Sequence, residues 1–139
     1  MKKLKGLIIL LIISLSLFGA AGCADQSGNE STTEAKISYQ QITPQEAKKL
    51  METEKDYVII DARTQSEYEE GHIENAIMIP EYEIAERAEK ELPDKNQLIL
   101  VYCRSGRRSK IASQALADLG YTNVKEFGGI IDWPYSIVK

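Results

Sequence analysis

Cysteine and histidine are scarce in this 139-residue sequence, which has two cysteines and a single histidine, His72. No group of these residues has the spacing of a zinc site, so a structural zinc is not expected. If Cys23 is consumed by lipidation, Cys103 is the one free thiol, and this excludes both an intramolecular disulfide and a resolving cysteine. Nothing in the sequence indicates a metal, nucleotide or flavin, and no cofactor is predicted.

Long apolar runs are also lacking. The run over 7–18 has about twelve residues, whereas a membrane-spanning helix needs ~20. Three lysines precede it, and small residues follow it directly before Cys23, which resembles the lipobox of bacterial lipoproteins, with Ala20 where leucine is more usual. We predict a signal peptide over 1–22, lipidation of Cys23 and an extracytoplasmic, membrane-anchored domain. An ordinary secretory peptide or an uncleaved anchor are the alternatives.

Basic residues are in the minority once that segment is removed, with 14 basic against 21 acidic residues and a net charge of −7. An acidic chain is a poor partner for nucleic acid or for an anionic lipid surface, and no nucleic acid is predicted. Residues 24–36 are polar and contain no aromatic residue, so they cannot bury enough surface to fold. Residues 23–36 are therefore predicted to be a lipid anchor with a flexible tether, and residues 37–139 the folded domain.

The most hydrophobic segment of the domain ends on Cys103. Leu98–Cys103 is predicted to be a central, buried strand, and Ser109 is predicted to cap a helix over 109–119. The first N–H groups of a helix lack partners and carry partial positive charge, so the loop between strand and helix is a candidate anion site. A thiol at its rim has a lowered pKa. Cys103 is thus a candidate nucleophile, the alternative being a buried structural cysteine before a basic turn.

Apolar strands alternate with helices along the domain. Strands are predicted over 37–41, 57–60, 77–79, 98–103 and 124–127, and helices over 44–51, 66–70, 81–92 and 109–119. This alternation predicts an α/β domain with a largely parallel sheet and helices on both faces. Sites in such sheets lie beyond the carboxyl ends of the strands, where both Asp61 and Cys103 are expected.

Three groups of residues resemble those of the rhodanese, or sulfurtransferase, domain. The first is Asp61-Ala-Arg63 with Glu67-Tyr68, Gly71-His72-Ile73, Ala76 and Ile79-Pro80; the second is Cys103-Arg-Ser-Gly106-Arg-Arg-Ser109; the third is Ala115-Leu116, Leu119-Gly120-Tyr121, Val124, Phe127-Gly128-Gly129 and Trp133. They span nearly all of 37–139 in the right order. The resemblance implies a three-layer α/β/α domain around a five-stranded parallel sheet.

The resemblance also implies a thiosulfate-type sulfurtransferase. Cys103 would attack the outer sulfur of thiosulfate or of a persulfide donor, and its own persulfide would pass that sulfur to cyanide or a thiol. Amides of the loop would stabilise this persulfide, so the predicted substrate-binding residues are Arg104, Ser105, Gly106, Arg107, Arg108 and Ser109. Among them, Arg104 and Arg108 would hold an oxyanion, whereas Arg107 would face solvent.

Roles are also predicted for three residues outside the loop. Asp61 and Arg63 are predicted to pair and to brace the base of the loop, with a substrate contact of Arg63 as the alternative. His72 follows a glycine at a helix end and is expected to bond to local backbone.

Two other functions remain open. A sulfur carrier that does not turn over, or a thiol sensor, would need the same loop. A phosphatase or arsenate reductase would have a Cys-x5-Arg loop, but here Ser109 stands six places after Cys103 and the arginine comes one place early. A loop shorter by one residue favours a sulfur atom over phosphate.

Overall fold

In the computed structural model of this chain, residues 36 and 38–139 are described. The predicted signal peptide, Cys23 and the residues up to 35 lie outside the described residues, as does Ile37. Within the described part, no helix is both long enough and apolar enough to cross a membrane.

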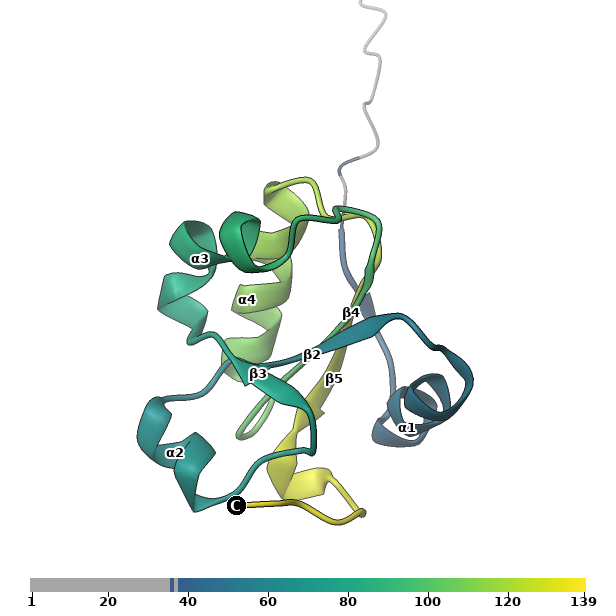
Figure 1. The fold of residues 1–139 in the computed structure, drawn as a ribbon, viewed down its shortest axis with the longest axis vertical. Helices are drawn as coiled ribbons and strands as arrows, with labels where there is room; N and C mark the ends of the chain where they lie inside the picture. Colours follow the sequence, from purple (N-terminus) through teal and green to yellow (C-terminus); the bar gives the residue numbers. More distant parts are fainter. Residues whose placement is uncertain (1–35, 37) are drawn as a thin grey trace, which may run out of the picture. The chain divides into compact units, whose positions relative to one another are not determined.

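Five parallel strands form one sheet within residues 38–139, in the order β1-β5-β4-β2-β3 (Figure 1). Their bounds are β1 Gln40–Gln41, β2 Tyr57–Asp61, β3 Ala76–Met78, β4 Leu98–Cys103 and β5 Val124–Gly129. The α/β class and the central place of the strand that ends on Cys103 are therefore confirmed. The predicted first strand is wrong in extent for the residues from 38 onward, because within this described part only Gln40 and Gln41 pair, in register with β5 at the edge of the sheet.

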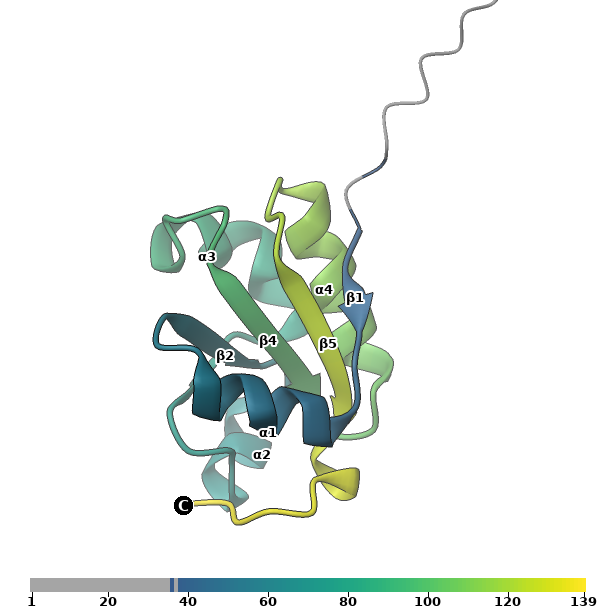
Figure 2. The ribbon, with the colours of Figure 1, turned by 90° about the vertical axis from the view of Figure 1, so that its right-hand side faces the viewer.

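Helices cover both faces of this sheet. Their bounds are α1 Pro44–Thr53, α2 Gln65–Glu70, α3 Ile84–Glu91 and α4 Arg107–Asp118, with short 3-10 turns η1 Glu81–Glu83 and η2 Ile130–Asp132. Both views place α3 and α4 on one side of the sheet and α1 on the other (Figures 1 and 2). The three-layer arrangement follows from the alternation of strands and helices in the sequence.

The core has two parts because successive residues of a strand point to opposite faces of the sheet. Ile99, Val101 and Cys103 of β4 pack in the part that contains Leu116 of α4. Leu100, Tyr102 and their neighbours pack in the other part, toward α1, with Ala47, Phe127 and Trp133. All six residues of β4 are buried, so this closely packed strand holds Cys103 in a fixed position at its end.

Two helices begin with a reciprocal capping box. Thr43 accepts a hydrogen bond from the Glu46 N–H, and the Glu46 carboxylate accepts one from the Thr43 N–H, as the sequence Thr-Pro-Gln-Glu predicts. Thr64 and Glu67 make the same arrangement at the start of α2. The second box matters for the site, because it fixes the Glu67 carboxylate near the carboxyl edge of the sheet.

Candidate active site

The carboxyl ends of the central strands meet at one edge of the sheet. Asp61 at the end of β2 pairs with Tyr102, and Cys103 at the end of β4 pairs with Gly129 of β5. Cys103 is only 1% exposed, and its Sγ accepts a hydrogen bond of 3.1 Å from the Gly106 N–H. The thiol is therefore enclosed, but it lies under the amides of the loop and not among apolar side chains alone.

The surroundings of Cys103 favour its thiolate. Burial raises the pKa of the Cys103 thiol, but hydrogen bonds from the side chain and N–H of Ser109 and from the N–H groups of Gly106 and Ser105 outweigh it. The net effect holds the pKa of Cys103 below its ordinary value. Because the thiolate is the nucleophile, this environment suits covalent chemistry at sulfur.

The helix after the loop begins earlier than predicted, and Ser109 does not cap it. Helix α4 begins at Arg107, and its N-cap is Gly106, whose φ of 97° lies in the left-handed region. Glycine adopts this conformation without steric cost, and the turn directs the loop amides toward Sγ. Ser109 instead lies buried in the first turn, where its hydroxyl is 3.1 Å from the Gly106 carbonyl oxygen and 2.6 Å from Glu126 Oε1.

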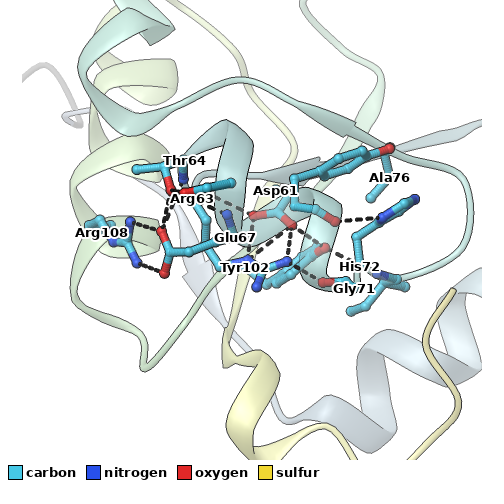
Figure 3. A network of polar contacts seen from close by, with 12 residues as sticks. Asp61, Arg63, Thr64, Glu67, Gly71, His72, Ala76, Tyr102 and Arg108 are labelled. Atoms are coloured by element: carbon cyan, nitrogen blue, oxygen red, sulfur yellow. Dashed lines mark hydrogen bonds and ion pairs between the residues drawn. The ribbon is translucent and has the colours of Figure 1, made fainter. Parts of the chain in front are cut away.

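The three arginines of the loop have different surroundings. Arg104 and Arg107 are exposed. The exposure of Arg107 agrees with the prediction that it faces solvent. Arg108 is half-buried, and its Nη1 and Nη2 donate to the two carboxylate oxygens of Glu67, each at 2.7 Å (Figure 3). The guanidinium predicted to hold an oxyanion thus already binds a carboxylate of the protein. A contact of Arg108 with substrate stays a prediction.

Glu67 belongs to the first group of residues that resemble the rhodanese domain, but the sequence analysis assigned it no role in the site, although the motif Thr64-Gln-Ser-Glu67 is a readable capping signal. Hydrogen bonds from Arg108 lower the pKa of Glu67 to about 2, assisted by Thr64 and opposed by burial. A carboxyl group whose pKa is lowered in the folded state stabilises the fold fully at pH values above its ordinary pKa, which is near 4.5 for glutamate. This stabilisation is lost as the pH falls through the folded-state pKa of about 2.

We therefore expect Glu67→Gln to lower the free energy of unfolding by about 1–2 kcal/mol at pH 7, since solvent screens a partly exposed pair. Urea unfolding measures the effect, and the difference from wild type should narrow as the pH falls from about 4.5 toward 2. Glu83→Gln is the matched control, because Glu83 pairs with Arg87 at the surface, where such pairs contribute only ~0.3–0.5 kcal/mol. An equal, small effect of both variants would contradict a special role of Glu67.

Asp61 and Arg63 pair as predicted, in the interior. Arg63 Nη2 donates to Asp61 Oδ2 at 2.6 Å and to the Gly71 carbonyl oxygen at 2.7 Å, and the Tyr102 hydroxyl donates to Asp61 Oδ2 at 2.5 Å (Figure 3). None of the hydrogen bonds of this pair within residues 38–139 reaches 104–109. The pair therefore braces the end of α2 and Tyr102, directly before Cys103, and not the loop itself.

His72 lies against its own helix end. Its Nδ1 is 3.0 Å from the Tyr68 carbonyl oxygen, and its ring stacks on the Tyr68 ring with centroids 3.7 Å apart. The expected bond to local backbone is confirmed.

Two residues of β5 shape the loop from its other side, and the sequence analysis assigned neither of them a role in the site. Glu126 is 3% exposed, and its Oε1 accepts hydrogen bonds from the Ser109 hydroxyl and the Gly128 N–H. Gly129 lies so close to the loop that an added Cβ would be 2.1 Å from the Arg104 carbonyl oxygen. The sequence does contain a signal for Glu126. It lies two positions after Val124 and therefore on the same face of the predicted strand, where an apolar residue is expected and an acid is unusual.

Comparison with known proteins gives concordant matches. Residues 43–134 match the sequence model of a family described as "Rhodanese-like domain". The thiosulfate sulfurtransferase PspE of Escherichia coli (strain K12) is 42% identical over 80 residues, which cover 58% of this chain and 77% of that protein. The thiosulfate sulfurtransferase GlpE of Coxiella burnetii is 38% identical over 98 residues, covering 70% and 89% respectively. A solved structure described as a rhodanese with anions from E. coli has 40% identity and a TM-score of 0.57, covering 60% of this chain and 98% of that one.

Proposed function

This chain belongs to the rhodanese-like domain family and is a rhodanese-type sulfurtransferase, and on that premise we propose that Cys103 carries the transferred sulfur as a persulfide. The observation that carries the proposal is the position of Sγ at the end of β4, where the Gly106 N–H donates to it at 3.1 Å. Amides that stabilise a thiolate there can also stabilise the anionic outer sulfur of a persulfide.

The reaction proposed for Cys103 has two displacement steps. In the first, an electron pair of the thiolate forms a bond to the outer sulfur of thiosulfate, and the sulfur–sulfur bond of thiosulfate breaks, so that sulfite leaves with that electron pair. In the second, cyanide or a thiolate attacks the outer sulfur of the persulfide, and the Cys103 thiolate leaves. Charge balances in each step, and the enzyme returns to its starting state without an external oxidant or reductant.

Positive charge around the loop supports an anionic sulfur donor. Arg104 and Arg107 are exposed on the loop that follows the thiol, in a chain whose net charge is −4. A local cluster of positive charge raises the concentration of a small dianion at the loop, and this effect weakens as salt is added. Thiosulfate is the donor in the names of the relatives PspE and GlpE, and we propose it as a donor for this chain.

Mass spectrometry of the reduced protein after incubation with thiosulfate tests the proposal. The expected result is a gain of one sulfur atom on the peptide that contains Cys103, with one sulfite released per chain. Addition of cyanide should remove the sulfur and give many turnovers, whereas a carrier would load once and stall. Hydrolysis of a phosphate ester without any sulfur adduct would contradict the assignment and favour a phosphatase.

We also propose that the domain is held outside the cytoplasm by a lipid on Cys23. The support is the sequence alone: lysines, an apolar run and small residues directly precede this cysteine. Metabolic labelling with a fatty acid and fractionation of the cells test this location. Cys23→Ser should lose both the label and the membrane association, whereas Cys103→Ser should keep both. Label that persists in Cys23→Ser would refute the lipid attachment.

A further inference from the structure

Glu126 is a buried carboxylate that the sulfur-transfer steps do not use. It lies on β5, where its neighbours in register are Gln41 of β1 and Val101 of β4, neither of them charged. A carboxylate taken out of water needs hydrogen-bond donors in compensation. Glu126 Oε1 has two, the Ser109 hydroxyl at 2.6 Å and the Gly128 N–H at 2.8 Å.

The Ser109 hydroxyl has one proton to donate, and Glu126 is its nearest acceptor. The other oxygens near it are the carbonyls of Gly106 at 3.1 Å and of Gly128 at 3.4 Å. A charged acceptor at the shortest distance takes the proton. The proton of the Ser109 hydroxyl therefore goes to Glu126, while Cys103 Sγ accepts its hydrogen bond of 3.1 Å from the Gly106 N–H.

The carboxylate also lies directly behind the loop that receives sulfur. The N–H of Gly106 donates to Cys103 Sγ, while a Cβ built on Gly106 would lie 4.0 Å from Glu126 Oε1. An open cavity of about 320 Å³ adjoins the carboxylate and the outer side of the loop, and its charged lining residues in the described chain are Lys110 of α4, Asp132 of η2 and Glu126. A buried negative charge here opposes an anion in the loop more strongly than an exposed one, which water screens.

We propose that Glu126 is a positioning residue that limits how strongly the loop stabilises negative charge at Cys103, by placing its own buried negative charge behind the loop. The consequence for catalysis rests on the function proposed above. A thiolate that is stabilised less is more basic and therefore more nucleophilic, and the optimum attacking thiol titrates near the ambient pH. Glu126 keeps Cys103 reactive at the cost of weaker binding of the donor anion.

Glu126→Gln tests this inference, because the amide oxygen can still accept both hydrogen bonds but carries no charge. Two changes are expected: alkylation of Cys103 by iodoacetamide begins at lower pH, and its limiting rate at high pH falls. The KM for thiosulfate should fall roughly three- to tenfold, without an increase in kcat. The alkylation profile involves no sulfur transfer, so it tests the action of Glu126 even if thiosulfate is not a donor.

Two control variants separate charge from structure. Asp132→Asn removes an exposed acid from the same cavity and should change KM less than about twofold, because its charge is screened. Glu126→Asp keeps the charge and should keep a KM near that of wild type. A fall in the KM of Glu126→Asp would contradict the role of the charge even if Glu126→Gln does not fold. An unchanged alkylation profile and KM in Glu126→Gln would overturn the proposal. A rise in the KM of Glu126→Gln would also overturn it, because removal of the negative charge is expected to strengthen binding of the donor anion.

Discussion

Cys103→Ser is expected to lose cyanide-dependent formation of thiocyanate from thiosulfate by at least about a thousandfold, the scale seen when a covalent nucleophile is removed. A serine hydroxyl does not ionise near neutral pH and cannot form the sulfur–sulfur bond of the intermediate. The variant should fold, because oxygen replaces sulfur at a position that is 1% exposed and already accepts an N–H from Gly106. Thiocyanate formation and the intact mass after thiosulfate treatment are the measurements.

Cys23→Ser is the natural control for this experiment, because it removes the other cysteine of the chain and leaves Cys103 in place. It should retain the activity and the sulfur adduct. A loss in Cys103→Ser much smaller than about a thousandfold would show that the nucleophile has been misassigned, since no other cysteine is present in residues 36 and 38–139.

Gly129→Ala is expected to disrupt the loop although the backbone at this position suits any residue. Its φ of −117° and ψ of 151° are ordinary extended values. The added methyl, however, would lie 2.1 Å from the Arg104 carbonyl oxygen and 2.6 Å from Ser105 Cα, both backbone atoms. Either the loop or the end of β5 must move, and a displacement of about 1 Å at a reacting group can cost roughly a hundredfold in rate.

We therefore expect kcat/KM to fall by about tenfold to a hundredfold and the free energy of unfolding to fall by about 1–3 kcal/mol, the usual cost of overpacking. Gly120→Ala is the matched control. Gly120 follows the last turn of α4, at the opposite end of that helix from the loop. Its φ is 90°, with no atom within 4 Å of an added Cβ. It should lose about 1–2 kcal/mol through backbone strain and keep its activity. If Gly129→Ala keeps wild-type kcat/KM, the loop does not rest on β5.

The order of strands and helices and the candidate nucleophile could be read from the sequence, because their signals are local. Each of these signals involves residues only three to six positions apart. Examples are the apolar run of β4, the capping box at Thr43 and the glycine of the loop. The same locality places Cys103 at the end of a strand and before a helix. Motifs within short segments were therefore sufficient for the fold class and for the family resemblance.

The partners of the loop residues depend on the tertiary structure. Arg108 meets Glu67, 41 positions earlier in the chain, and Ser109 meets Glu126, 17 positions later. These contacts exist because the sheet order brings the ends of β2, β4 and β5 to one edge. Ser109 also does not occupy the predicted capping position, because the chain turns at Gly106, three residues earlier. The preceding residues Arg104 and Ser105 pack closely against Gly129 of β5. Local sequence thus determined which groups could react, whereas the packing of distant strands decided which charges face them.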